Sequence, residues 1–312
     1  MNNQSRYRQL SDLHRRLPLF FQPWWLDTLS QHWDIALVET GKGVQAIMPF
    51  QLEKKWGLRL LRNPPLCPYL GPLFFTGPDQ QKQWSEEDRL LETLLQQVPK
   101  WDYFQLTTVP GFQNFLPFYQ RGFTNSNRLT YLLDLSQPEE ALFGQISPRL
   151  RQYIKSAQKI LHIEQQQPDV ALFLSWHKKA FEKKGKPYPF SSPLIEKILT
   201  VAEQHRASLF QTAFNEQNQA VAMLWTPFDG QTSYHLLAAT VPGPTHNGAL
   251  ALLTWSAIKS AKARGKKHYD FEGSMDKGIE AFFRKFGGRR VPYLQFEHCP
   301  SRLWQLKRSF WG

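Results

Sequence analysis

The stretch that decides the fold is HYDFEGSMDKGIEAFFRKFGGRRVPYLQF, residues 268–296. It opens with an extended segment, passes through an acidic turn that contains glycine, and continues as an aromatic helix. Gly287 and Gly288 end that helix, because glycine readily adopts the left-handed conformation in which helices stop. A second extended segment, VPYLQF, follows. This one unit therefore predicts strand, turn, helix and strand in that order.

The same order of elements occurs earlier in the chain. WDYFQL at 101–106 is followed by glycine and phenylalanine positions and then by RLTYLLDL at 128–135. Three pairs of identical residues share one offset in sequence between the two stretches: Phe104 and Phe271, Gly111 and Gly278, Phe115 and Phe282. Agreement in both order and glycine position indicates a chain built from two related halves.

The segments upstream of these stretches also correspond. In the first half, WDIALVE and VQAIMPFQL alternate in polarity around GKG, which is typical of a β-hairpin. A third extended stretch is expected at LGPLFF, and a helix is expected to start at Ser85. In the second half, SLFQTAF, AVAMLWTPF and TSYHLLAAT predict three antiparallel strands before the helix ALALLTWSAIKSAKARG. Each half thus predicts β-β-β-α-β-α-β with a splayed mixed sheet, an α+β fold.

Composition limits the classes of protein that fit. The 312 residues suit two domains, and the formal net charge of +12 favours anionic partners without choosing among them. The two cysteines, Cys67 and Cys299, lie outside any metal-binding spacing, so neither a zinc site nor a disulfide framework is expected. We find no P-loop, GxSxG, HExxH or Rossmann motif. Without a signal peptide or an apolar run of ~18 residues, we expect a cytoplasmic protein without membrane insertion.

The halves resemble the GNAT acyltransferase fold present twice. The tandem arrangement is similar to the Fem-type proteins, which are the peptidoglycan-bridge aminoacyltransferases and their acetyltransferase-like relatives. The resemblance covers nearly the whole chain and is carried by LPLFFQPWWLDTL (17–29), LLDLSQPEEALFGQISPRLRQYIKSAQK (132–159), WSAIKSAKARGKKHYDFEGS (255–274) and FFRKFGG (282–288).

The resemblance implies two tandem GNAT-like domains, each a mixed, mostly antiparallel sheet flanked by helices. We expect the first over residues 1–135 and the second, with the reaction site, over 136–299. A helix at 300–312 is expected to return to the first domain.

A donor site is implied in the loop VPGPTHNGALA, 241–251. The resemblance implies acyl-CoA, such as acetyl-CoA, as co-substrate, with phosphates held by backbone N–H groups at a helix N-terminus. The loop departs from the Gln/Arg-x-x-Gly-x-Gly/Ala pattern of the family at its prolines and at the missing Arg or Gln. A rigid turn that only starts a helix is therefore the alternative. The implied donor-binding residues are Gly243, Thr245, Asn247, Gly248 and Ala249.

Asp270 and Glu272 are the candidate catalytic acids. They alternate along a predicted strand, so we expect both on one face, with Glu272 accepting the amine proton. Ser274 is a candidate donor to an oxyanion, and Tyr234 a candidate partner of the acyl or amine group. The alternatives are that Asp270 caps a turn, and that the neighbouring His235 is structural. One of Tyr234 and His235 is expected to face the cleft and the other the core.

Basic side chains supply candidate contacts to substrate. Arg151, Lys155 and Lys159 are four apart and form one face of a helix, which suits phosphate binding or simply a solvated surface. The Fem-type pattern FK-x-x-FG carries a Lys where this chain has Phe283. The implied substrate-binding residues are Arg149, Arg151, Lys155, Arg284 and Lys285.

The sequence thus predicts an N-acyltransferase that moves an acyl group from an acyl-CoA-type donor to an amine of a sugar, peptide or cell-envelope precursor. One alternative is an aminoacyl-tRNA-dependent transferase of the peptidoglycan-bridge type, favoured by the charge and disfavoured by Phe283. The other is a non-catalytic GNAT scaffold that binds RNA or an anionic polymer. No metal is expected in the site.

Overall fold

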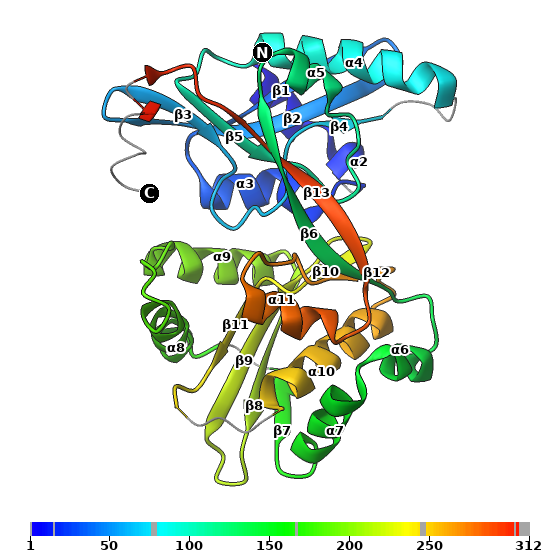
Figure 1. Ribbon diagram of the computed structural model, residues 1–312, viewed down its shortest axis with the longest axis vertical. Coiled ribbons are helices and arrows are strands. Elements are labelled where there is room, and N and C mark those ends of the chain that lie inside the picture. The colour runs from blue at the N-terminus through cyan, green and yellow to red at the C-terminus, as the bar shows by residue number, and fades with distance from the viewer. Residues whose placement is uncertain are drawn as a thin grey trace. The chain divides into compact units, whose positions relative to one another are not determined.

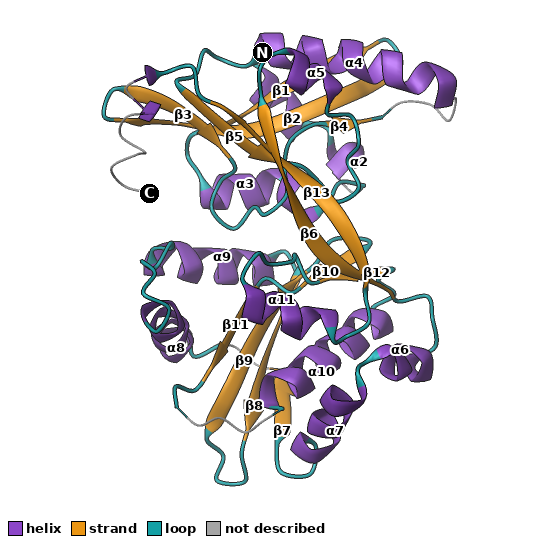
Figure 2. Cartoon of the chain, viewed as in Figure 1, coloured by secondary structure: helices purple, strands orange, loops and turns teal. Residues whose placement is uncertain are grey.

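The computed structural model describes residues 2–14, 16–75, 80–165, 168–243, 248–302 and 304–305 (Figures 1 and 2). The elements of the first half are α1 (Asn3–Arg8), α2 (Ser11–His14), η1 (Leu19–Phe21), α3 (Pro23–Leu29), β1 (Trp33–Thr40), β2 (Gly43–Lys55), β3 (Leu58–Arg62), β4 (Leu73–Phe74), α4 (Gln80–Gln97), β5 (Tyr103–Thr107), α5 (Leu116–Gln120) and β6 (Thr124–Asp134). Those of the second half are α6 (Glu139–Gln145), α7 (Pro148–Ala157), β7 (His162–Gln165), α8 (Val170–Glu182), α9 (Ser192–Gln204), β8 (Ser208–Phe214), β9 (Ala220–Pro227), β10 (Thr232–Tyr234), β11 (Leu237–Thr240), α10 (Ala249–Ala263), β12 (His268–Asp270), α11 (Lys277–Arg284) and β13 (Arg289–His298). None of the helices among these residues is long and apolar enough to cross a membrane.

The chain divides into two compact units. Unit 1 contains residues 1–128 and 292–312, and unit 2 contains residues 129–291. In unit 1, β13 pairs antiparallel with β5, and in unit 2, β6 pairs antiparallel with β12. The last strand of each half of the sequence therefore pairs in the unit built by the other half. This pairing is why residues 292–299 belong to unit 1 and not to the second domain expected from the sequence.

Unit 1 has the predicted meander, with a different third strand. The β1–β2 hairpin is as expected, and β2 then pairs antiparallel with β3 across a turn at Trp56 and Gly57. Both turn residues have positive φ (54° and 76°), as a tight hairpin turn requires. The stretch LGPLFF supplies only the two-residue β4, so its prediction as the third strand was wrong. Helix α4 begins at Gln80, earlier than the predicted Ser85.

Apolar burial holds unit 1 together. Helix α4 packs on β1 and β2, and its leucines share a core with Phe104 of β5 and Phe118 of α5. At the other end of the chain, Trp304 is buried against Leu60 and Tyr103. Trp304 is thus the part of the expected terminal helix that contacts unit 1; residues 303 and 306–312 lie outside the described residues.

Unit 2 contains a four-stranded sheet with the order β11-β9-β8-β7. Along β9, Leu224 faces the core that includes α10 and α7, whereas Trp225 points to the opposite face, where Val170 of α8 and Leu199 of α9 lie. Figure 1 shows this layering of helices around β8 and β9. The predicted α+β class, with mixed sheets flanked by helices, is confirmed.

The predicted strand TSYHLLAAT is in fact two strands. Its first part, β10, pairs parallel with β12, with Tyr234 opposite Asp270. Its second part, β11, pairs antiparallel with β9, with Leu237 opposite Trp225. His235 and Leu236 between them belong to neither strand. The sheet therefore splays at these two residues, as the sequence pattern predicts for a crossover to a parallel strand.

Candidate active site

A cavity of about 460 Å³ opens at the splay. The break between β10 and β11 contributes one wall, and the chain that follows β12 contributes another. Helices α8, α10 and α11 supply the rest, so the whole lining belongs to unit 2. The lining residues are His177, Lys184, His235, Leu236, Ala238, Leu250, Phe271, Glu272, Gly273, Ser274, Asp276, Gly278, Ile279, Phe282 and Phe283.

Glu272 reaches the cavity from a turn and not from a strand. β12 ends at Asp270, and Glu272 has a φ of +56°, which is uncommon for a residue other than glycine. Its backbone N–H donates to Asp270 Oδ1 at 2.7 Å. The predicted strand alternation of the two acids is therefore wrong, because the chain turns between them. Glu272 lines the cavity, and Asp270 is not among the described residues that do.

Asp270 instead holds this turn in place. The carboxylate is 2 % exposed and accepts two hydrogen bonds at Oδ1, one from the Glu272 N–H and one from Thr130 Oγ1 at 2.5 Å. A carboxylate that accepts from a backbone N–H two residues ahead fixes the local turn. Asp270 therefore has the turn-capping role, which is the alternative to a catalytic one.

Burial sets the protonation chemistry of Glu272. The side chain is 8 % exposed, and its desolvation raises the pKa of the carboxyl well above 4.5; the negative charge of Asp270 raises it further. A general base needs a pKa closer to neutrality than that of an ordinary glutamate. The environment of Glu272 changes its pKa in that direction.

The two candidates on the splayed strand face opposite ways. Tyr234 is buried, and its hydroxyl donates to Asp229 Oδ2 at 2.6 Å; it does not line the cavity. His235 does line the cavity and stacks on Phe271. Burial lowers the pKa of His235 to about 3, so the ring is neutral. Of the two candidates, the structure places His235 in the lining with Glu272 and does not place Tyr234 there.

At the rim, Ser274 and Asp276 organise the start of α11. Asp276 Oδ1 accepts from the N–H groups of Gly278 and Ile279, an N-cap, and Asp276 Oδ2 accepts from Lys184 Nζ at 2.9 Å. Ser274 lines the cavity, and its Oγ accepts from the Asp276 N–H. The contact of Lys184 brings the segment after α8 to the rim.

We expect Asp276→Ala to lower the free energy of unfolding by about 1 kcal/mol, because the substitution removes the N-cap of α11. Asp276→Asn is the matched control: it keeps the capping oxygen and loses only an exposed ion pair of little energetic value. Urea unfolding of both variants provides the comparison. Equal losses for the two variants would assign the stability to the Lys184 ion pair instead.

The donor loop is described only in part. Thr245 and Asn247 lie outside the described residues, whereas Gly243, Gly248 and Ala249 are within them. Gly248 precedes α10 with a φ of +118°, and a Cβ there would lie 2.6 Å from the carbonyl oxygen of Tyr153. Among the described residues no side chain caps α10, and no acid lies in its first turn. The first backbone N–H groups of α10 have no partner within the helix, and Leu250 of this turn lines the cavity.

The basic candidates lie elsewhere on unit 2. Arg149 donates to the Tyr153 hydroxyl, Arg151 to the Gly144 carbonyl, and Lys155 lies over the ring of Phe143. Arg284 pairs with Glu280 at 3.7 Å, and Lys285 is exposed. Among the described residues, the cavity lining includes none of these five basic side chains. The structure does not bring them together with Glu272.

In unit 1 the end of β5 is covered by the chain that follows β3. Beyond the parallel pair of β3 and β5, Thr107 donates its N–H to Asn63 Oδ1 and accepts at its carbonyl from the Leu70 N–H. Gly71 packs against Thr108. Residues 63, 70 and 71 therefore pack on the chain at the end of β5 in unit 1.

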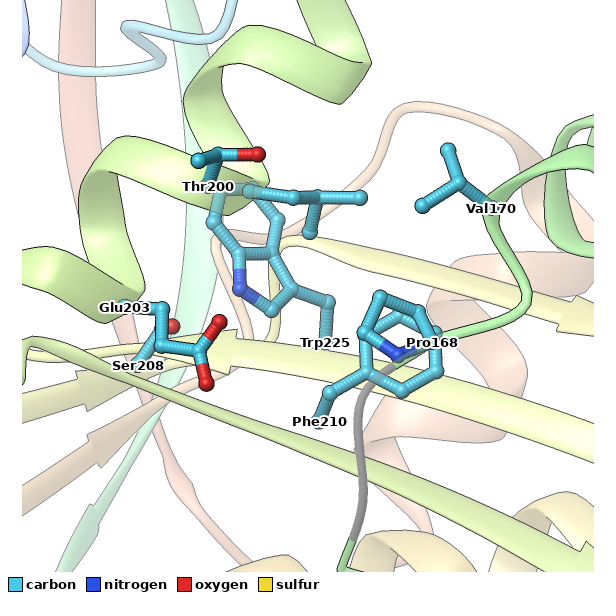
Figure 3. A pocket seen from close by; sticks show the side chains of 8 residues that line it. Pro168, Val170, Thr200, Glu203, Ser208, Phe210 and Trp225 are labelled. Carbon is cyan, nitrogen blue, oxygen red and sulfur yellow. The ribbon is translucent and has the colours of Figure 1, made fainter.

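A second, smaller cavity of about 90 Å³ lies on the outer face of the β8–β9 sheet (Figure 3). Trp225 and Phe210 rise from the sheet into it, with Glu203 and Thr200 of α9 on one side and Val170 on the other. None of the predicted site residues lies here. No cluster of His, Cys, Asp or Glu that suits a metal ion occurs in the described part of either unit.

The sequence model of the acetyltransferase (GNAT) domain family matches residues 145–284, which contain the splay and the cavity. Residues 145–284 are thus similar in sequence to a GNAT acetyltransferase domain. No curated protein matches the sequence. This match covers less than half of the chain, whereas similarity to solved structures extends over nearly all of it.

The chain has the tandem GNAT fold. It is similar to the crystal structure of FemX, with a TM-score of 0.69, 14% identity and 98% of each chain covered. It also matches a tandem GNAT protein from the clavulanic acid biosynthesis pathway, with a TM-score of 0.54, 10% identity, and 88% and 86% of the two chains covered. A third match is the C-terminal domain of a putative lysylphosphatidylglycerol synthetase from Agrobacterium fabrum, with a TM-score of 0.53, 12% identity, and 95% and 92% covered. The prediction of two GNAT-like halves is confirmed.

Proposed function

We propose that this protein transfers an acyl group from an acyl-CoA-type thioester to an amine, in the cavity of its GNAT domain. The observation that carries the proposal is Glu272, a buried carboxyl in the lining of a cavity at the splay of two parallel strands. The acyltransferase-like family of the domain gives the class of reaction. Glu272 gives that reaction a base.

The donor enters from the side of α10 in this proposal. The N–H groups of its first turn, which no described side chain caps, suit a phosphate, which helix N-termini bind well. Leu250 of the same turn continues into the cavity, next to Leu236 and Ala238 of the splayed strand. An apolar wall therefore connects a phosphate bound at α10 with Glu272. This arrangement suits a long thioester with a charged end.

In the reaction, the amine nitrogen attacks the thioester carbonyl carbon. The C–N bond forms, the C–S bond breaks, and the Glu272 carboxylate takes the proton that the amine nitrogen loses. That proton then passes to the departing thiolate, so the products are an amide and a thiol. Bringing the two reactants together in one cavity supplies much of the rate, up to about 7–11 kcal/mol of barrier.

The lining favours a thioester over an aminoacyl-tRNA. Phe283 occupies the position where the Fem-type pattern carries a Lys, and its ring lines the cavity and packs on His235 and Phe271. Within the described lining, the cation is Lys184, and Asp276 already pairs with it. An apolar wall suits an uncharged acyl chain better than it suits the charged α-amine of an aminoacyl ester.

Thermal unfolding with added ligand tests the donor class, because a ligand that binds only the folded protein raises the melting temperature. We expect acetyl-CoA and free coenzyme A to raise it, and tRNA to have a smaller effect. Transfer to a panel of amino-sugar and peptide amines is then followed through the thiol released. Stabilisation by tRNA alone favours the aminoacyl-tRNA alternative. RNA binding with a steep salt dependence and no thiol release favours the binding scaffold.

A further inference from the structure

His235 differs from an ordinary structural histidine in the way its ring is held. Nδ1 lies 3.0 Å from the hydroxyl of Tyr269, a residue that is completely buried. A buried hydroxyl donates its proton to an acceptor, and the partner that the structure gives Tyr269 is this nitrogen. The Tyr269 hydroxyl therefore donates, and Nδ1 accepts.

That direction fixes the tautomer of His235. A neutral imidazole carries one proton, so a ring whose Nδ1 accepts must carry it on Nε2. Burial holds the pKa of the ring at about 3, which keeps the ring neutral over the working range of the protein. Burial also raises the pKa of Tyr269, so its hydroxyl keeps the proton that it donates. The result is an uncharged Nε2–H donor.

The ring presents this donor to the cavity. His235 lines the cavity, and within the part of the chain that the structure describes, no residue bonds to Nε2. Phe271 stacks on the ring and Phe283 meets it edge-on, so both aromatic neighbours fix its plane. Glu272 lines the same cavity from the turn after β12.

The backbone at the splay is already used. The His235 N–H donates to the Asp270 carbonyl at 2.8 Å, and the Leu236 N–H to the Tyr234 carbonyl at 3.0 Å. Neither residue therefore has a backbone N–H left that could donate to a carbonyl oxygen in the cavity. The donor that remains between β10 and β11 is the side chain of His235.

We propose that His235 Nε2–H donates a hydrogen bond to the carbonyl oxygen of the acyl thioester and stabilises the negative charge that this oxygen gains when the amine attacks. The proton stays on Nε2 throughout, and Glu272 alone exchanges protons with the amine. This inference rests on the proposed function, since it assigns the oxygen-binding group of the same reaction. Tyr269 is a positioning residue that acts through the ring.

A measurement of the tautomer tests the inference without turnover. In the full chain labelled with ¹⁵N-histidine, long-range ¹H–¹⁵N spectra identify His235 as the signal that disappears in His235→Phe. We expect Nε2 to be protonated and Nδ1 bare from pH 5 to 9. Tyr269→Phe removes the donor to Nδ1 and should change this pattern. Tyr188→Phe, which breaks the similar 3.0 Å contact to His177, is the matched control and should leave the protonation pattern of His235 unchanged. A protonated Nδ1 in the wild type overturns the inference.

Kinetics test the role itself. His235→Phe keeps the stacked ring and should lower kcat by about 10²–10³, the effect of losing one oxyanion donor, with the KM for the amine unchanged. His235→Gln retains an N–H donor and should keep more activity than His235→Phe. If His235→Phe misfolds, Tyr269→Phe carries the test, with a smaller loss of kcat expected. Wild-type kcat in the folded His235→Phe variant overturns the inference and leaves the proposed function standing. A wild type that releases no thiol, and whose His235 signal does not shift with acetyl-CoA, overturns the proposed function and this inference together.

Discussion

Glu272→Gln should lower the rate of acyl transfer by about 10²–10⁴, the usual contribution of a general base. Gln is nearly the same shape as Glu but cannot take a proton from the amine. The substitution leaves the hydrogen bond to Asp270 intact, because its donor is the backbone N–H of residue 272 and not the side chain. The measurement is thiol release under saturating donor and amine. A variant that keeps the wild-type rate removes Glu272 from the reaction.

The same substitution should stabilise the protein, and the gain should grow with pH. The folded chain holds the Glu272 proton to a higher pH than the unfolded chain, whose carboxyl ionises near 4.5. Above 4.5 and up to the raised folded pKa, the folded state binds more protons, so rising pH costs wild-type stability. Each unit of pKa difference corresponds to about 1.4 kcal/mol. Gln does not ionise, so the variant does not lose this stability.

Urea unfolding at pH 5 and pH 8 measures the effect. The difference between Glu272→Gln and wild type should be larger at pH 8. Glu216→Gln, at an exposed position in the turn between β8 and β9, is the matched control and should show no such change with pH. A stability gain that is equal at both pH values would mean that burial does not strain the charged form of Glu272.

Burial of the Glu272 carboxyl is thus expected both to lower the stability of the folded protein and to make this carboxyl a better base. A glutamate on the surface costs nothing in stability, but its pKa is too low for a good base toward an amine. In this protein the apolar lining and the charge of Asp270 both raise the pKa of Glu272. The two effects of Glu272→Gln, slower transfer and higher stability, share one physical cause.

The order of elements was predictable because it depends on local patterns. The two halves repeat the same succession of strands and helices, and hydrophobic periodicity with glycine stops is enough to detect it. The third strand of unit 1 was misplaced because LGPLFF is more apolar than LRLLR. The turn at Trp56 and Gly57 is the local signal that identifies β3. Which unit receives β6 and which receives β13 depends on long-range pairing, and the sequence pattern does not carry it.

The candidate site was predictable to the level of its segment. Of the predicted segment DFEGS, the last four residues line the cavity and Asp270 does not, because the strand ends at Asp270 and strand alternation does not extend to Glu272. Tyr234 and His235 could not be told apart, since a period of two assigns opposite faces without saying which face is open. His177 and Lys184 are separated from the turn by the sequence of α9 through β12, so only tertiary structure brings them to the cavity.

The turn itself depends on Gly273, and Gly273→Ala should be the most destabilising of the substitutions considered for this protein. A Cβ at this position would lie 1.7 Å from the carbonyl oxygen of Leu129 and 2.9 Å from the Cα of Thr130. Both neighbours are backbone of β6, which is hydrogen-bonded in the sheet and cannot move aside as a flexible side chain can. Gly273 also has a φ of +67°, where a side chain is strained.

Gly265→Ala separates the two causes, because Gly265 has nearly the same φ, +71°, and an added Cβ there meets nothing within 4 Å. The control should lose about 1–2 kcal/mol from backbone strain alone. Gly273→Ala should lose about 2–5 kcal/mol, because overpacking against backbone adds to the strain. The remaining folded protein should also transfer acyl groups poorly, since relief of the clash displaces Glu272, the preceding residue. Equal losses in the two variants would show that the left-handed conformation, and not the close approach to β6, requires glycine after Glu272.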